Sequence, residues 1–181
     1  FVDQIGKAKD ADAARDAYQA FLDAAAEAGW DVDAVSMVYA DRRLTLLQNE
    51  TAGSGSVSDK MSKIRDVANE LRDLGLVQEK IGKRDQKGGD LIRLAYEAVA
   101  SKARDDAGTD ADKLGEVERA YRAAEEFADN SAKARIEAEI ARMYNAAADQ
   151  CIADARDAGK GFNKCDALAK KAKNAMSGAI K

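Results

Sequence analysis

The feature that most constrains the fold is an apolar stripe with helical spacing between residues 61 and 74. Its members are Met61, Ile64, Val67, Leu71 and Leu74. Intervals of three and four residues place all five on one face of an α-helix, so we expect them to be mostly buried. Gly75 follows directly, and glycine is common where a helix ends in a left-handed conformation. None of the 181 residues is a proline, so no proline breaks a helix anywhere in the chain.

Similar stripes recur along the chain and predict helices over residues 2–28, 33–50, 57–74, 91–107, 114–127, 131–158 and 163–176. Gly29 ends the first of them, and we expect Trp30 to pack over that helix end. Hydrophobic residues make up 46% of the chain and aromatic residues only 6%, which favours helices packed closely through alanine. The sequence therefore predicts an all-α bundle of about six to seven helices.

One flexible connector divides the predicted bundle. Residues 53–56 are Gly-Ser-Gly-Ser, a composition typical of a linker. We expect residues 1–52 to form an N-terminal helical hairpin, and residues 57–181 to form a helical-hairpin region packed with it as one domain. The longest apolar runs are far shorter than the roughly 20 residues that cross a bilayer, so no membrane span is predicted.

The C-terminal half contains an internal repeat with an offset of 48 residues. This offset places Tyr96 on Tyr144, Val117 on Cys165 and Ala124 on Ala172. Each copy has a long helix, a glycine-containing turn and a shorter return helix, so we predict stacked αα-hairpins. Residues 123–147 resemble the junction between tetratricopeptide-like repeats, although the longer period and the missing Trp-Leu-Gly positions depart from that family.

The residue types present exclude most catalytic chemistry. The chain has no histidine, which removes Ser-His-Asp and Cys-His catalysis and histidine-based metal sites. Its two cysteines are 14 positions apart, with no CxxC pair. The Asp31-x-Asp33 and Asp110-x-Asp112 pairs lack the ligands that complete a calcium loop and are better explained as helix N-caps. We therefore predict no catalytic residues, no metal site, no cofactor and no enzyme activity.

The charge distribution is uneven. The formal net charge is −4, which argues against broad attraction to nucleic acid or anionic membranes. Residues 1–50 carry ten acidic and five basic side chains, whereas residues 160–181 carry six lysines and one aspartate. These opposed charges have three interpretations: they orient a partner, they pair the two ends of the chain with each other, or they form an ordinary solvated helical surface.

Three classes of function remain. The leading hypothesis is a non-catalytic protein that binds other proteins, as an accessory subunit of a larger assembly, through grooves lined by Tyr, Met and Ala. A second hypothesis is a helical carrier or sensor that holds a small ligand or pigment between helices. Its candidate lining residues are Tyr18, Trp30, Tyr39, Tyr96 and Tyr144, although their spacing fits core positions better.

The remaining hypothesis, which ranks above the small-ligand carrier, is a winged-helix-like nucleic-acid-binding protein. Residues 62–77 resemble a recognition helix that leads into a wing, with residues 91–94 as the returning strand. The nucleic-acid contacts would come from Lys80, Lys83, Arg84 and Lys87 on the intervening hairpin. The acidic residues of the helix and the anionic chain argue against this function. The glycine-rich segment 76–90 is equally compatible with a loop, a short hairpin or a poorly formed helix.

The two cysteines predict a disulfide. Cys151 and Cys165 lie on the apolar stripes of two helices joined by a turn near residues 159–161, which brings them opposite each other in an antiparallel hairpin. The alternative is two buried thiols in a reducing compartment. The chain begins at Phe1, consistent with a removed signal or transit peptide or an artificial boundary. We expect an exported protein in the periplasm, outside the cell or in an organelle lumen, or a cytoplasmic one if both cysteines are reduced.

Overall fold

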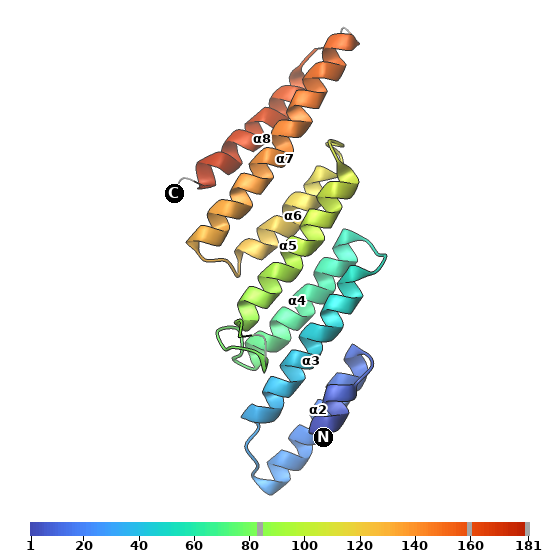
Figure 1. The fold of residues 1–181 in the computed structure, drawn as a ribbon, viewed down its shortest axis with the longest axis vertical. Coiled ribbons are helices and arrows are strands. Elements are labelled where there is room, and N and C mark those ends of the chain that lie inside the picture. Colours follow the sequence, from blue (N-terminus) through green and yellow to red (C-terminus); the bar gives the residue numbers. More distant parts are fainter. Residues whose placement is uncertain (83–84, 159–160, 180–181) are drawn as a thin grey trace. The chain divides into compact units, whose positions relative to one another are not determined.

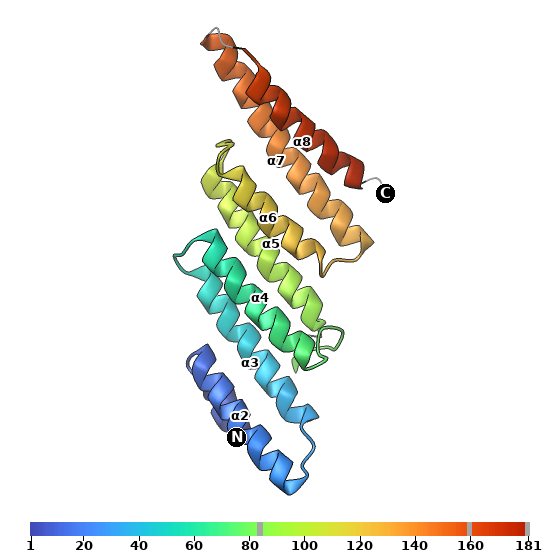
Figure 2. The same cartoon turned by 180° about the vertical axis from the view of Figure 1, so that it is seen from behind.

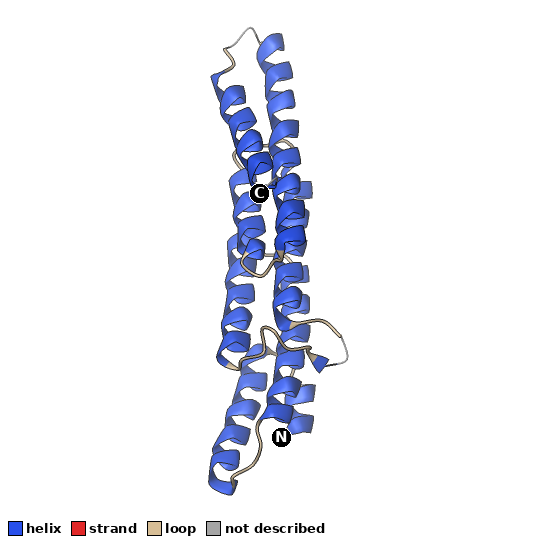
Figure 3. Ribbon diagram, turned by 90° about the vertical axis from the view of Figure 1, so that its left-hand side faces the viewer, coloured by secondary structure: helices blue, strands red, loops and turns tan. Residues whose placement is uncertain are grey.

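The computed structural model describes residues 1–82, 85–158 and 161–179. Within these ranges it contains eight helices and no strand (Figure 3). The helices are α1 (Val2–Lys7), α2 (Ala11–Ala28), α3 (Asp33–Ala52), α4 (Val57–Asp73), α5 (Gly88–Ala107), α6 (Leu114–Glu125), α7 (Asn130–Asp157) and α8 (Asn163–Ala179). The all-α prediction is confirmed. None of these described helices combines the length and the hydropathy needed to cross a membrane.

The first predicted helix is in fact two helices. Asp10 has an extended backbone, and its side chain accepts a hydrogen bond of 2.8 Å from the Ala13 amide, which makes it the N-cap of α2. Arg42 of α3 donates a hydrogen bond of 2.7 Å to the Ala8 carbonyl at the end of α1. Ile5 and Ala8 are nevertheless buried, so the apolar stripe continues across the break. Periodicity alone therefore did not reveal the local capping that separates α1 from α2.

The chain divides into two compact units, which we call the N-terminal unit (Phe1–Ala95) and the C-terminal unit (Tyr96–Lys181). In the N-terminal unit, α2 packs against α3 and α3 packs against α4 (Figures 1 and 2). The rings of Tyr18 and Tyr39 stack with their centroids 4.3 Å apart, and the hydroxyls of Tyr18 and Ser36 are hydrogen-bonded at 2.7 Å. These contacts join α2 to α3 through both apolar and polar parts of the interface.

The α4 stripe has the predicted orientation. Ile64, Val67 and Leu71 are buried, while Met61 and Leu74 are partly buried. Gly75 ends the helix with φ +70°, and the Leu76 amide donates to the Leu71 carbonyl at 2.8 Å. This hydrogen bond is typical of a Schellman motif, which the Leu-Gly-Leu sequence predicted.

The segment between α4 and α5 contains a short hairpin, one of the three predicted alternatives. Lys80 and Lys87 form an isolated antiparallel bridge, and the Ile81 amide donates to the Gln86 carbonyl at 3.0 Å. The predicted returning strand at residues 91–94 is wrong, because α5 already begins at Gly88. Leu91 and Ile92 are buried on a helical face instead, so the segment is not the strand of a wing.

In the C-terminal unit, α7 and α8 lie side by side in an antiparallel hairpin (Figures 1 and 2). Their closest approach depends on small buried residues: Ala147, Ala148, Cys165, Ala172 and Ala175. The 48-residue offset relates several positions of similar burial, such as Ile92 and Ile140 or Ala100 and Ala148. It fails at Leu114 and Phe162, since Leu114 is fully buried and Phe162 is 43% exposed. The predicted hairpin architecture of this half is nevertheless confirmed.

Two ion pairs attach the second half of α5 to α7. Arg104 lies 3.0 Å from Glu139, and Arg135 lies 2.8 Å from Glu97. A third polar contact joins α6 to α7, where the Tyr144 hydroxyl donates to Glu118 at 2.7 Å. These contacts fix the helices that support the groove described below.

Candidate functional site

The C-terminal unit carries an open groove of about 690 Å³. Its walls come from the C-terminal half of α7, the beginning of α8 and the turn between α5 and α6. We call it the α7–α8 groove. Its apolar lining is Ala107, Ala111, Ala147, Ala155, Ala158 and Leu168, and its polar lining is Thr109, Asp110, Gln150, Asp154 and Lys164, together with Cys151 and Gly161.

The α7–α8 groove exists because small side chains occupy the facing surfaces. We predicted Ala147 and Cys151 as members of the buried stripe of the long helix. Ala147 is buried, but Cys151 is only partly buried and lines the groove. Alanine and cysteine are too short to fill the space that leucine or phenylalanine would occupy at the same positions. The sequence signal for the groove was therefore this run of small residues. Helical periodicity places them on one face but does not show whether that face is accessible.

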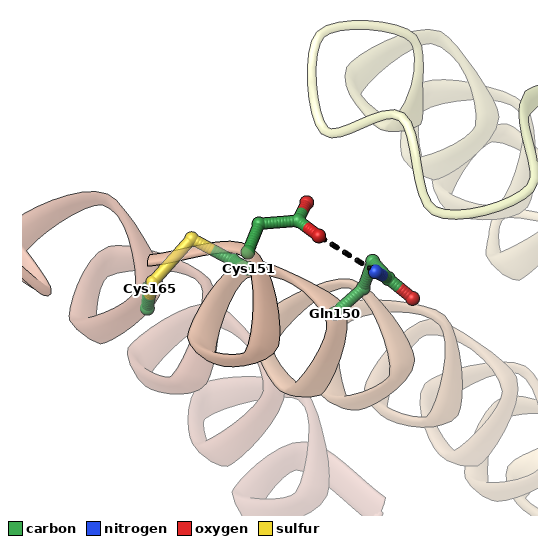
Figure 4. Close-up of a disulfide and its surroundings, with 4 residues drawn as sticks. Gln150, Cys151 and Cys165 are labelled. Atoms are coloured by element: carbon green, nitrogen blue, oxygen red, sulfur yellow. Dashed lines mark hydrogen bonds between the residues drawn. A yellow bond between two sulfur atoms is a disulfide. The ribbon is translucent and has the colours of Figure 1, made fainter. Parts of the chain in front are cut away.

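The predicted cysteine pair lies at one edge of the groove. Cys151 of α7 and Cys165 of α8 are at disulfide distance, with their Cα atoms 5.4 Å apart (Figure 4). Cys165 is buried at 2% exposure, whereas Cys151 faces the groove. Next to Cys151, the side-chain amide of Gln150 donates a hydrogen bond of 2.8 Å to Asp154. The covalent link and the hydrogen bond both restrict the shape of the α7 wall.

Charged side chains connect the α5–α6 turn to α8. Lys164 of α8 lies 3.5 Å from Asp112 of the turn. Within the turn, Asp110 accepts a hydrogen bond from the Asp112 amide at 3.1 Å and pairs with Lys113 at 3.3 Å. The backbone hydrogen bond from Asp112 is the main reason that the pKa of Asp110 is lowered, with Lys113 adding to the effect. The predicted N-cap role of Asp110 is wrong, because Lys113 holds the N-cap position of α6, and Asp110 forms a local Asx turn instead. The same holds for Asp31, which accepts from the Asp33 amide while Val32 holds the N-cap position of α3.

A polar cluster around the buried Tyr144 was not predicted from the sequence. The Tyr144 side chain is 1% exposed, and Lys171 donates a hydrogen bond of 3.1 Å to its hydroxyl, which itself donates to Glu118. Burial is the main cause of the raised pKa of Tyr144, and the hydrogen bond to Glu118 adds to it. The cluster joins α6, α7 and α8, so it stabilises the framework of the groove rather than forming a second opening.

The structure describes two of the four basic residues that the nucleic-acid hypothesis predicts as contacts. Lys80 lies 2.5 Å from Asp85, and Lys87 donates a hydrogen bond of 3.4 Å to Gln78. Lys83 and Arg84 lie outside the described residues. The two described lysines are thus engaged within the hairpin itself.

The four tyrosines of the small-ligand hypothesis occupy core positions. Tyr18, Tyr39, Tyr96 and Tyr144 are all buried at 7% exposure or less, as core residues of their own units. The expectation that Trp30 packs over a helix end is wrong for its side chain, which is 54% exposed. The backbone motif is present, since Gly29 has φ +68° and the Trp30 amide donates to the Ala25 carbonyl. None of these five aromatic residues lines the α7–α8 groove.

The groove has few groups that could perform chemistry. The chain has no histidine, and within residues 1–82, 85–158 and 161–179 no three Cys, Asp or Glu side chains are grouped to hold a metal ion. Asp110 and Asp154 are the carboxylates of the lining, and each already accepts a hydrogen bond.

Comparison with known proteins gives no family assignment. No protein-family model, no curated protein and no solved structure matches the chain. The proposal of function therefore depends on the residues and geometry of this chain.

Proposed function

We propose that the chain is a non-catalytic α-helical accessory subunit that binds a segment of another protein in the α7–α8 groove. The observation that carries this proposal is the lining of the groove, in which alanines of α7 and of the region around the α5–α6 turn lie beside carboxylate, amide and ammonium groups. Alanine walls let the backbone of a bound helix or extended segment approach closely, while the polar groups offer hydrogen bonds. Small-molecule sites are usually more enclosed and richer in aromatic side chains.

The framework of the groove supports the same proposal. The Cys151–Cys165 pair connects its two helical walls, and Lys164–Asp112 connects α8 to the turn. A surface that is already ordered loses less conformational entropy when a partner binds, so less binding free energy is spent on ordering. This pre-organisation suits a permanent subunit contact.

We also propose that the protein works in an oxidising compartment, such as the periplasm, the extracellular space or an organelle lumen. A disulfide between Cys151 and Cys165 persists only where thiols are not kept reduced. Intact-mass analysis after alkylation, with and without a reductant, tests this point. Two thiols that react in the unreduced, denatured protein would argue for a reducing compartment.

A matched pair of charge reversals tests the groove. Asp154→Arg places a long cation inside it, whereas Asp157→Arg makes the same charge change three residues later on an exposed position outside it. We expect Asp157→Arg to retain the partner that co-purifies with the wild-type chain, and Asp154→Arg to lose it. The partner is quantified by mass spectrometry after affinity isolation of all three full-length chains from the native source.

The interpretation of this test requires that both variants remain folded, which circular dichroism establishes. Equal recovery of every co-purifying protein by the wild type and both variants would contradict binding in the groove. Loss of the same protein from both variants would indicate a general charge effect and would also contradict it.

A further inference from the structure

The exposed face of α2 is acidic and ends at an exposed tryptophan. Asp16, Asp23 and Glu27 follow one another at intervals of seven and four residues, so they share one face of the helix. This face lies opposite the buried stripe of Ala14, Tyr18, Phe21 and Ala25. Trp30 comes directly after the helix end and is 54% exposed. We call Asp16, Asp23, Glu27 and Trp30 the α2 face.

No basic side chain of α2 neutralises this face. The only Lys or Arg in α2 is Arg15. Its guanidinium is engaged with Asp12 at 3.0 Å and with Glu70 of α4 at 2.9 Å. The α2 face therefore combines several negative charges with one large aromatic side chain that is left in contact with water.

The exposed side of α8 has the complementary character. Lys170 and Lys173 are exposed, and Phe162 and Met176 are each 43% exposed near the two ends of the same helix. Asp166, the only acidic residue of α8, is exposed on the same side, so this side carries two positive charges and one negative charge. The buried stripe of α8 is Cys165, Leu168, Ala172 and Ala175, and Phe162 and Met176 lie outside it. We call Phe162, Lys170, Lys173 and Met176 the α8 face.

We propose that the α2 face of one copy of this chain docks on the α8 face of a second copy. Opposite charges steer the two surfaces together, and the exposed Trp30, Phe162 and Met176 lose contact with water in the interface. Aromatic residues and methionine are enriched at protein interfaces, and each of these faces provides at least one of them. Both partners are present in any preparation of the protein, because each chain carries both faces.

The two faces use different residues, so one contact joins the α2 face of one copy to the α8 face of another. Two copies can make this contact twice in a reciprocal dimer, or further copies can be added. In either case the average mass rises with the protein concentration. The assembly does not involve Asp154, so it is independent of partner binding in the α7–α8 groove.

Sedimentation velocity of the full chain tests the assembly. At about 0.1 M salt, where charges interact over about 10 Å, we expect the average mass to exceed that of the monomer and to rise with concentration. At about 1 M salt the range falls to about 3 Å, and the average mass should return toward the monomer. A wild-type chain that remains monomeric at low salt across the whole concentration range would overturn the proposal.

Charge reversal identifies the two faces. We expect Asp23→Lys with Glu27→Lys, and separately Lys170→Glu with Lys173→Glu, to be monomeric when each is studied alone. Mixing these two double variants restores complementary faces, so the mixture should associate again. The control, Asp66→Lys with Asp73→Lys, makes the same charge change on exposed positions of α4 and should associate like the wild type.

Fluorescence supplies a second readout, because Trp30 is the only tryptophan. Its emission should shift to shorter wavelength as the wild-type concentration rises, and should not shift for the Lys170→Glu, Lys173→Glu variant. Association that survives both charge reversals, or a mixture that remains monomeric, would overturn the proposal. Asp154→Arg should leave the assembly unchanged, which separates this inference from the groove proposal.

Discussion

Replacing Glu70 with Gln should destabilise the N-terminal unit by about 3 kcal/mol. Glu70 of α4 accepts a hydrogen bond of 2.6 Å from the Nε of Arg43 and another of 2.9 Å from Arg15. Arg43 is 3% exposed, and its Nη1 already has no hydrogen-bond partner. Removing the charge of Glu70 leaves the Arg43 guanidinium buried without a counter-ion, which typically costs 3–5 kcal/mol, and the oxygen retained by Gln favours the lower end of that range.

Urea unfolding measures this effect. With a denaturant slope of about 1–3 kcal/mol per molar, a loss of about 3 kcal/mol lowers the midpoint by about 1–3 M. The control is Arg15→Gln, because the Arg15 side chain is 51% exposed and its ion pair should contribute less than about 1 kcal/mol. The double change Arg43→Met with Glu70→Leu should recover most of the loss, since it removes both charges. A Glu70→Gln midpoint equal to that of Arg15→Gln would refute the reasoning.

The same ion pair predicts an acid dependence. Burial alone would raise the pKa of Glu70, but hydrogen bonds from Arg43 and Arg15 outweigh burial and lower it below its ordinary value of 4.5. A lowered folded-state pKa means that the stabilisation is complete above about pH 4.5 and is lost as the pH falls through the lowered value. Glu70→Gln should flatten this part of the stability profile. An unchanged acid profile in the variant would show that other carboxylates cause the loss.

Three further changes have defined outcomes. Leu71 is 1% exposed, so Leu71→Asp should lower the free energy of unfolding by at least as much as a buried Leu→Ala change, which costs roughly 2–5 kcal/mol. An unaltered melting temperature would contradict the burial of this side chain. Replacing both Cys151 and Cys165 with Ala removes a cross-link between residues 14 positions apart and should lower the free energy of unfolding by about 3 kcal/mol. Urea unfolding against the oxidised wild type measures this loss, and equal midpoints would show that no disulfide stabilises the hairpin. Burial raises the pKa of Tyr39 from 10.0 to about 12, so stability should be complete below pH 10 and decline as the pH rises toward 12; a Tyr39→Phe chain with the same alkaline decline would contradict this assignment.

The sequence was sufficient for the fold class because the helices have strong local signals. Apolar spacing located α4, and the Leu-Gly-Leu sequence located its end, since both depend on residues close together in the chain. The proximity of Cys151 and Cys165 was also predictable, because a short turn between two helices places them opposite each other. The break at Asp10 was missed because one capping hydrogen bond leaves the apolar period unchanged.

The candidate site was less predictable, because it depends on which side of each helix remains uncovered. Cys151 has the sequence surroundings of a core residue, yet it is only partly buried and lines the groove. Local periodicity reports a helical face, whereas exposure depends on which distant segments pack on that face. The Arg43–Glu70 ion pair is similarly hidden in the sequence, because its partners are 27 residues apart and on different helices.

Native mass spectrometry of the full chain, isolated from its natural source without a reductant, tests the central claim most directly. We predict a complex in which the chain is bound to a different protein, and this complex should be lost for Asp154→Arg and retained for Asp157→Arg. Copies bound only to each other would support the α2–α8 contact but not the accessory-subunit function. A free chain, or a chain carrying a small molecule and no protein, would contradict the proposed function.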